Sequence, residues 1–355
     1  MLARLIFSYQ YKQCFTQCSL VHASSGKNKL NKKKILGELE TDTLLRNRYQ
    51  VIALIGQGGM GAVYLTQDTR LPGRRCALKE IRLPPTFSAK AEKQAREQFH
   101  NEASTLARLD HPHLPKVSDF FSIQGRDYLV MDYVAGSDLL QIVREARRKN
   151  RFLPESQVLS WIDQLCDALS YMHRQDPPIL HRDIKPENIK LTPEGDIKLV
   201  DFGLVKPLDP DEMSTFTGLR GMGSLPYTPL EQYGDAQDHT DVRSDLYALG
   251  ATLYHLLTGT APPSAQEIFV KDDTLVLPRQ LNPDLSPPVE NAILAAMSSH
   301  PGDRPPSVEV WRKLLHAHSR PLPPASPWKE AWLANGWLIV IGAMLTAIVI
   351  YLTLS

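Results

Sequence analysis

Cysteine is scarce in this chain, which has four cysteines among 355 residues. The four do not form a metal-binding pattern, because a structural zinc site needs about four ligands and Cys14 and Cys18 are isolated. Cys76 and Cys166 lie in apolar strand and helix patterns, so we expect both to be buried. A zinc-binding function is therefore disfavoured.

Net charge is also nearly absent, with 40 basic residues against 39 acidic ones. Nothing in this balance argues for nucleic acid as a partner, and we predict none. A signal peptide is not indicated, because the only apolar core near the start, residues 5–7, is too short. We expect residues 1–46 to be a disordered basic segment that forms a solvated tail. The alternative is that its lysines contact anionic lipid.

The middle of the chain carries chemically specific residues at fixed spacing, in Leu180-His181-Arg182-Asp183-Ile184-Lys185-Pro186-Glu187-Asn188-Ile189 and in Asp201-Phe202-Gly203. Between the two motifs, residues 189–191 and 197–200 predict a hairpin of short strands. That hairpin would bring Asn188 and Asp201 to the same side. The motifs resemble those of the eukaryotic-like serine/threonine protein kinases of bacteria. The resemblance covers about 270 residues and implies an α+β fold of two lobes, a small β-rich lobe with one long helix and a larger, mainly helical lobe.

A glycine-rich segment upstream matches G-x-G-x-x-G-x-V. A similar motif opens dinucleotide-binding folds, but a helix follows the turn there, whereas residues 62–67 predict a strand. The remaining alternative is a hairpin that binds nothing. In a strand-loop-strand element, missing side chains let backbone N–H groups approach triphosphate oxygens. The resemblance makes this the ATP-binding loop, formed by Ile55, Gly56, Gln57, Gly58, Gly59, Met60, Gly61, Ala62 and Val63.

Residues 76–79, Cys-Ala-Leu-Lys, resemble the family's V-A-I-K strand. The resemblance implies that Ala77 lies over the adenine ring and that Lys79 reaches the α and β phosphates. A lone lysine in a strand is usually only solvated, so the case for Lys79 depends on a partner.

Residues 88–109 predict a long helix that is rich in Ala, Glu, Lys, Gln and Arg. Four apolar residues at spacings of three and four predict an inward stripe: Phe99, Ala103, Leu106 and Leu109. Glu102 lies beside this stripe and is the predicted partner of Lys79. Glu92 and Glu97 are the alternatives, expected to be solvated.

The resemblance assigns a chemical task to each matched polar residue. Asp183 would accept the proton of the substrate hydroxyl, and Lys185 would stabilise the transferring phosphoryl group, as in serine/threonine kinases. Asp201 and Asn188 would ligate Mg²⁺, with Mn²⁺ as an alternative, because hard oxygen ligands suit a hard cation. The expected cofactors are thus ATP and Mg²⁺. The alternative is that these residues only cap turns. That alternative must explain why all four polar residues lie at the spacing of the family.

Residues 128–136 predict an apolar strand that runs into a polar turn, and the resemblance makes them the hinge beside adenine. Met131 would guard the back of the pocket, while the Asp132 carbonyl and the Val134 N–H would pair with the base. Lys190 departs from the family, which usually places an apolar residue under adenine. We expect its methylene stem to form the floor while its ammonium reaches solvent, with some loss of ATP affinity.

Control elements follow. Arg182 is the residue that pairs with activation-loop phosphate in the family, so we predict autophosphorylation at Thr215 or Thr217. The alternative is that both are ordinary loop threonines. By resemblance, Glu231 pairs with Arg304 although Pro229-Leu230 departs from the family's A-P. Ser224 is expected near the acceptor site, and Asp245 is expected to anchor the catalytic loop from a buried helix.

The end of the chain has its own pattern. Residues 331–355 carry no charge, and residues 337–354 are almost continuously apolar, long enough for a helix to cross a bilayer. A buried core helix is the alternative, but it would be amphipathic. We predict a kinase domain at 47–318, a proline-rich linker at 319–332 and a transmembrane helix at 333–354. The flanking Lys329 favours a cytoplasmic kinase on a single C-terminal anchor in the lipid bilayer, and small residues in the span hint at a homodimer.

These patterns together predict a membrane-anchored serine/threonine protein kinase that transfers the γ-phosphate of ATP to protein substrates. A kinase-folded scaffold without activity, a pseudokinase, is the main alternative, supported only by Lys190 and Pro229-Leu230. A small-molecule kinase is a weaker one, because Lys185 and the segment 214–223 indicate peptide positioning.

Overall fold

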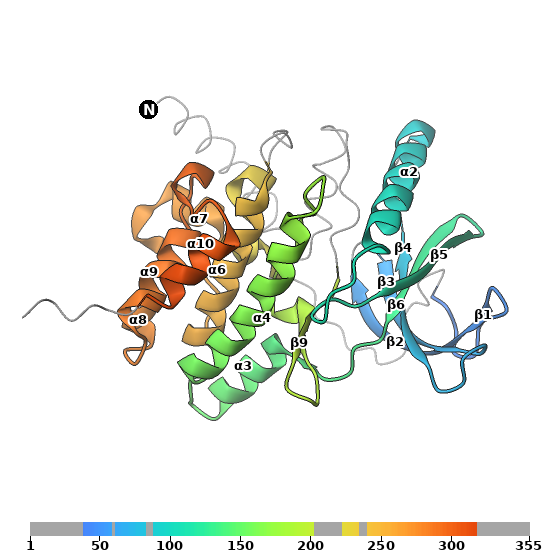
Figure 1. The fold of residues 1–355 in the computed structure, drawn as a ribbon, viewed down its shortest axis with the longest axis horizontal. Helices are drawn as coiled ribbons and strands as arrows, with labels where there is room; N and C mark the ends of the chain where they lie inside the picture. Colours follow the sequence, from blue (N-terminus) through green and yellow to red (C-terminus); the bar gives the residue numbers. More distant parts are fainter. Residues whose placement is uncertain (1–37, 59–60, 83–87, 202–221, 234–239, 318–355) are drawn as a thin grey trace, which may run out of the picture. The chain divides into compact units, whose positions relative to one another are not determined.

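The computed structural model describes residues 38–58, 61–82, 88–201, 222–233 and 240–317. Its first part, residues 44–132, contains an antiparallel sheet with the strand order β1-β2-β3-β4-β6-β5. Figure 1 shows these strands in blue to green, side by side. Their bounds are β1 (Leu44–Leu45), β2 (Tyr49–Gly58), β3 (Gly61–Asp68), β4 (Arg75–Ile81), β5 (Val117–Ile123) and β6 (Arg126–Asp132).

Gly61 is required where β2 turns into β3. Its φ is +143°, and a Cβ there would lie 1.8 Å from the carbonyl oxygen of Glu80 on β4. Only a residue without a side chain fits this approach. The predicted strand after the glycine-rich segment is confirmed, because β3 begins at Gly61 and alternates buried and less buried residues.

Helix α2 (Ala89–Leu106) follows the first four strands and packs against β5. Phe99, Ala103, Leu106 and Leu109 are all at most 5% exposed. The predicted inward stripe is therefore confirmed, although the helix ends three residues before Leu109.

The second half of the described chain is mainly helical. Helix α6 is almost wholly buried from Ser244 to Thr258 and packs against α4, α9 and α10, as Figure 1 shows. It ends at Gly259, whose φ of 68° is a left-handed cap. The helices are α3 (Leu139–Arg148), α4 (Glu155–His173), α6 (Val242–Thr258), α7 (Ala265–Val270), α8 (Pro278–Leu281), α9 (Pro287–Ala296) and α10 (Val308–Leu315).

A small sheet joins β7 (Ser137–Asp138), β8 (Ile189–Leu191) and β9 (Ile197–Leu199). Strands β8 and β9 form the predicted hairpin, with Ile189 opposite Leu199. Short 3₁₀ helices connect the larger elements, at η1 (Pro186–Asn188), η2 (Met222–Tyr227), η3 (Leu230–Gln232), η5 (Asp272–Thr274) and η6 (Pro301–Asp303). The predicted β-rich part with one long helix and the helical part are thus both present.

The predicted disordered segment 1–46 extends too far. Leu45 is buried and pairs with Tyr49 between β1 and β2, and the backbone N–H of Leu39 donates to the Tyr64 hydroxyl at 3.1 Å. These leucines are apolar residues that the sheet can cover, so the last residues of this segment belong to the folded part. Residues 1–37 lie outside the described part.

The predicted linker at 319–332 and the predicted transmembrane helix at 333–354 also lie outside the described residues. Within residues 38–317, none of the described helices has the length and apolar character needed to cross a bilayer.

Candidate active site

Asp245, in the first turn of α6, is buried and fixes the backbone of the Asp183 loop (residues 181–188). Its carboxylate accepts hydrogen bonds from the N–H groups of His181 and Arg182, each at 2.8 Å. His173 Nε2 lies 3.0 Å from the same carboxylate. Burial opposes ionisation of Asp245, but the bond and charge of His173 and the bonds to the loop hold its pKa below the ordinary value. The anchoring role predicted for Asp245 is confirmed.

Four polar side chains meet beside that anchor. The Lys185 ammonium lies 2.9 Å from Asp183 Oδ2 and donates to Ser224 Oγ at 2.7 Å. Asn188 Nδ2 donates to the Asp183 carbonyl and to Asp183 Oδ2, both at 2.8 Å. Asp183 is therefore held by two donors, and Ser224 is linked to it through the Lys185 ammonium. The expected position of Ser224 near the acceptor site stays a prediction.

Asp201 follows the β8–β9 hairpin and forms an ion pair with Lys79, with Nζ 2.8 Å from Oδ1. Its φ is 66°, a left-handed conformation that few residues other than glycine adopt. The charge of Lys79 is the main reason that the pKa of Asp201 lies below its ordinary value, and it outweighs burial. Asp201 thus presents an ionised carboxylate at neutral pH.

Asp201 and Asn188 supply the donor set that a hard cation prefers, a carboxylate and an amide oxygen. Because Asn188 donates through Nδ2 to Asp183, its amide oxygen is the atom that a Mg²⁺ would use. Within the described residues, no group of three His, Cys, Asp or Glu side chains is placed to hold a metal. A cation here would take its other oxygens from a phosphate ligand or water, which fits Mg²⁺ bound with a nucleotide.

Lys79 lies in β4 between Val63 of β3 and Leu129 of β6. Its predicted partner Glu102 accepts a hydrogen bond from Gln98 Nε2 at 2.9 Å, while Lys79 forms the ion pair with Asp201 described above. The pairing of Lys79 with Glu102 stays a prediction.

The residues predicted to line the adenine pocket lie on β4 and β6. Ala77 of β4 is buried and faces Met131 of β6 in register. Asp132, the last residue of β6, is fixed by its neighbours, because its N–H donates to the Lys116 carbonyl at 3.0 Å and its carboxylate accepts from Arg74 at 3.2 Å. These contacts place the strand that the sequence identifies as the hinge, while the base contacts of Asp132 and Val134 stay predictions.

Lys190 has a partner that the sequence did not reveal. Its ammonium lies 3.4 Å from Asp138 Oδ2, and the two residues face each other across β7 and β8. The other oxygen of Asp138 caps α3 by accepting from the Gln141 N–H at 2.9 Å. The Lys190 side chain is 29% exposed, so its ammonium is held by a carboxylate rather than extended freely into solvent.

Arg182 combines two unusual features. Its φ is 64°, and its Nε atom is buried with no hydrogen-bond partner among the described residues. The predicted phosphorylation sites Thr215 and Thr217 lie outside the described residues, as do Gly59 and Met60 of the glycine-rich loop.

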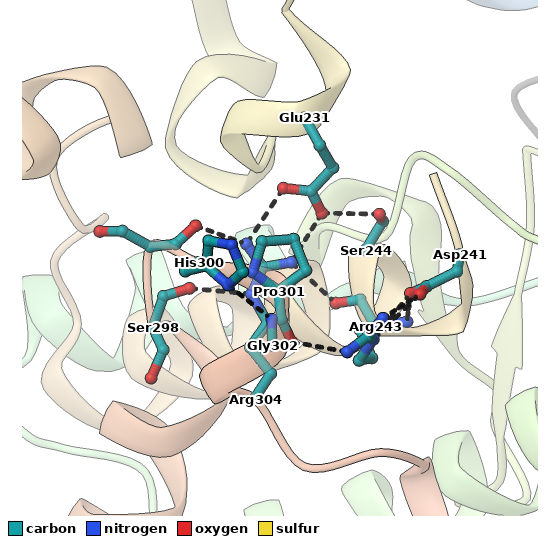
Figure 2. Close-up of polar contacts among 10 residues, drawn as sticks. Glu231, Asp241, Arg243, Ser244, Ser298, His300, Pro301, Gly302 and Arg304 are labelled. Carbon is teal, nitrogen blue, oxygen red and sulfur yellow. Dashed lines mark hydrogen bonds and ion pairs between the residues drawn. The ribbon is translucent and has the colours of Figure 1, made fainter. Parts of the chain in front are cut away.

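The predicted pairing of Glu231 with Arg304 is confirmed. Figure 2 shows the two side chains facing each other, and both Arg304 Nη atoms donate to the carboxylate, at 2.6 and 3.1 Å. Ser244 of α6 donates to the same carboxylate at 2.7 Å. Although burial raises the pKa of Glu231, the bonds from Arg304 and Ser244 hold it below its ordinary value.

Sequence reasoning missed one further pair near the site, between Tyr227 of η2 and His255 of α6. The Tyr227 hydroxyl lies 2.6 Å from His255 Nδ1, and both residues are buried. No spacing rule links two residues 28 positions apart in different elements, so the sequence offered no signal for this contact.

Comparison with known proteins gives a consistent result. The family model described as protein kinase domain matches residues 49–316. A probable serine/threonine-protein kinase of Streptomyces coelicolor is 33% identical over 293 residues, which are 79% of this chain and 41% of that protein. The serine/threonine-protein kinase pkn3 of Myxococcus xanthus is 35% identical over 285 residues, which are 76% of this chain and 50% of that protein. The chain thus spans about half the length of these curated relatives.

Solved structures agree. The PpkA-294 apo form is 25% identical with a TM-score of 0.64, and the match covers 78% of this chain and 99% of that one. The PknI kinase domain of Mycobacterium tuberculosis is 29% identical with a TM-score of 0.57, and the match covers 79% of this chain and 98% of that one.

Proposed function

This chain belongs to the protein kinase domain family, and we propose that it is a serine/threonine protein kinase that transfers the γ-phosphate of ATP to serine or threonine hydroxyls of protein substrates. The observation that carries the proposal is the Lys185 ammonium, which bridges Asp183 and Ser224 at hydrogen-bonding distance. A lysine there can neutralise charge on a phosphoryl group that passes close to Asp183.

The proposal assigns a residue to each step of the reaction. The substrate hydroxyl oxygen bonds to the γ-phosphorus as the bond from that phosphorus to the bridging oxygen of ADP breaks. The hydroxyl proton passes to the Asp183 carboxylate, which Asn188 and Lys185 orient. A bound Mg²⁺ would neutralise charge on the phosphates, and Asn188 and Asp201 are the residues that would hold it.

The test is phosphate transfer by the full chain to itself and to a generic basic protein, with labelled ATP and Mg²⁺. We expect transfer to serine or threonine, and a loss of about 10²- to 10⁴-fold in the Asp183→Asn variant. Asp196→Asn is the matched control, because Asp196 is an exposed aspartate in the β8–β9 turn. If neither the folded parent nor Asp183→Asn transfers phosphate, the result would instead support a pseudokinase that works by binding.

We further propose that phosphorylation at Thr215 or Thr217 activates the enzyme through Arg182. The buried Nε of Arg182, which has no partner among the described residues, supports this, because a buried N–H donor without an acceptor is costly and a phosphate would supply one. Mass spectrometry after incubation with Mg²⁺ and ATP should find phosphate on this segment. Mixing the parent with Asp183→Asn, and finding phosphate on the variant, would show that transfer occurs between molecules.

The same proposal includes a membrane anchor at 333–354, with the kinase domain on the cytoplasmic side and homodimers formed through the span. Its support is the uncharged, apolar character of residues 337–354. The full chain should remain with membranes in alkaline carbonate, whereas a chain that ends at residue 330 should be released. Crosslinking of the full chain in vesicles, compared with the shortened chain, tests the dimer.

A further inference from the structure

The buried pair of Tyr227 and His255 takes no part in the reaction as described. Tyr227 is the last residue of η2, and His255 lies in the last turn of α6. The two residues are 5% and 8% exposed, and their rings lie nearly parallel, with centroids 6.2 Å apart. Two polar groups are thus buried against each other at 2.6 Å, a short contact for a hydroxyl donor.

The chemistry of this contact favours a neutral hydrogen bond. Burial is the main reason that the pKa of His255 lies at about 4, and the charge of Arg144 on α3 acts in the same direction. Burial also raises the pKa of Tyr227, which Glu187 on η1 supports and Arg144 opposes. At neutral pH the imidazole therefore carries no charge and the phenol keeps its proton. In the tautomer with the proton on Nε2, the Tyr227 hydroxyl donates to Nδ1.

Segment η2 depends on such external contacts for its position. It is a six-residue 3₁₀ helix that contains Pro226, which has no N–H to donate. Ser224, in the same segment, accepts the hydrogen bond from Lys185 at 2.7 Å, and its carbonyl accepts from the Thr228 hydroxyl at 3.0 Å. The segment is therefore tied to the Asp183 loop through Ser224 and to α6 through Tyr227.

We infer that His255 is a positioning residue for phosphoryl transfer, which acts through Tyr227 to hold Ser224 against Lys185. The inference rests on the proposed kinase function. Helix α6 is buried along almost its whole length, so His255 gives η2 a fixed reference point. Loss of the bond should move Ser224 relative to Lys185 and lower the rate of transfer to protein, while the ATP pocket along β4 and β6 is unaffected.

The test compares three variants of the full chain. Tyr227→Phe removes the donor, and His255→Leu removes the acceptor but keeps a branched side chain. The matched control is Tyr254→Phe, because the neighbouring Tyr254 is also buried and its hydroxyl donates to the Val276 carbonyl at 3.0 Å, away from the site. All three should lose thermal stability, since each loses one hydrogen bond made by a buried side chain.

Activity should separate them. We expect kcat for a protein substrate to fall about tenfold in Tyr227→Phe and in His255→Leu, the size of effect that one buried hydrogen bond gives, while the KM for ATP and the kcat of Tyr254→Phe stay at the parent values. The double variant Tyr227→Phe with His255→Leu should be no slower than the slower single variant, because the two residues act as one unit. His255→Asn carries an acceptor oxygen on the same carbon as Nδ1 and should restore most of the rate.

The outcomes are distinguishable. If the parent shows no transfer activity, the proposed kinase function itself is refuted. An active parent with a parental kcat in Tyr227→Phe, an equal loss in Tyr254→Phe, or no recovery in His255→Asn would overturn the positioning role and leave the kinase function standing.

Discussion

Replacing Arg304 by methionine should destabilise the protein strongly. The Arg304 side chain is fully buried, and its guanidinium makes five hydrogen bonds, as many as it has N–H donors. Two of them reach the carboxylate of Glu231, and three reach backbone carbonyls of residues 243, 298 and 299. Methionine has a similar length but no donor. The buried carboxylate of Glu231 would lose both bonds from Arg304 and keep the hydrogen bond from the Ser244 hydroxyl.

The expected cost follows from this geometry. Removing one partner of a buried ion pair costs about 3–5 kcal/mol, because an uncompensated charge remains. For a domain of this size, each kcal/mol shifts Tm by about 2–4 °C, so Tm should fall by about 6–20 °C. The matched control is Arg312→Met: Arg312 contacts Asp163 and Asp167, both at 2.7 Å, but its side chain is 38% exposed. An exposed pair contributes about 1 kcal/mol or less, whatever its distance.

Denaturant unfolding and calorimetry of both variants would measure these values. The double variant of Arg304→Met with Glu231→Gln should recover part of the loss, since it leaves no buried charge unpaired. Equal costs in Arg304→Met and Arg312→Met, both near about 1 kcal/mol, would refute the reasoning that burial, rather than distance, sets the strength of the pair.

The pair also has a pH signature. The pKa of Glu231 in the folded protein lies below its ordinary value of 4.5, so its ionised form is the one that folding favours. Its contribution should be fully present above about pH 4.5 and be lost as the pH falls through the lower folded-state value. The stability difference between the parent and Glu231→Gln should therefore shrink in acid, and a difference that grows as the pH falls would contradict the assignment.

Three further outcomes are expected. In Asp245→Ala, two N–H groups of the Asp183 loop lose their acceptor, at about 1–3 kcal/mol each, so denaturant midpoint and kcat should both fall, whereas Asp245→Asn keeps one acceptor oxygen and should lose less. Lys79→Met removes a charge from the site, so kcat should fall about 10²- to 10³-fold. It also removes the main cause of the low pKa of Asp201, so that pKa should rise and the acid limb of the residual pH–rate profile should move to higher pH. Lys190→Leu supplies an apolar floor under the base, so the KM for ATP, measured by initial rates, should fall, while loss of the partly exposed pair with Asp138 should lower stability by about 1 kcal/mol or less.

Local patterns and family spacing predicted much of this molecule. The stripe on α2 could be read from the sequence because apolar residues three and four apart must share a face, and the β8–β9 hairpin could be read from two short apolar runs around a turn. The Glu231–Arg304 pair came from resemblance alone. Its geometry, with five hydrogen bonds from a fully buried guanidinium, came only from the structure.

Contacts between distant polar residues were the part that could not be predicted. Lys190 was expected to extend toward solvent, yet the register of β7 against β8 places it opposite Asp138. The ion pair of Lys79 with Asp201 was not expected either, because it joins residues far apart in the sequence, and Asp201 has a left-handed backbone. Both contacts follow from strand register and backbone dihedral angles, which residue type alone does not determine.

Helix α6 explains why these separate pieces form one site. Asp245 holds the Asp183 loop, Ser244 holds Glu231 of η3, and His255 holds Tyr227 of η2. Each of the three anchors is a polar side chain on an otherwise largely apolar, buried helix, where an unpaired polar group would be costly. Burial makes an unpaired polar group on this helix costly, and burial also holds the helix in place. A single helix therefore fixes segments that are far apart in the sequence relative to one another. The polar residues of α6 therefore position the segments of the candidate active site, and the apolar residues around them hold the helix in the core.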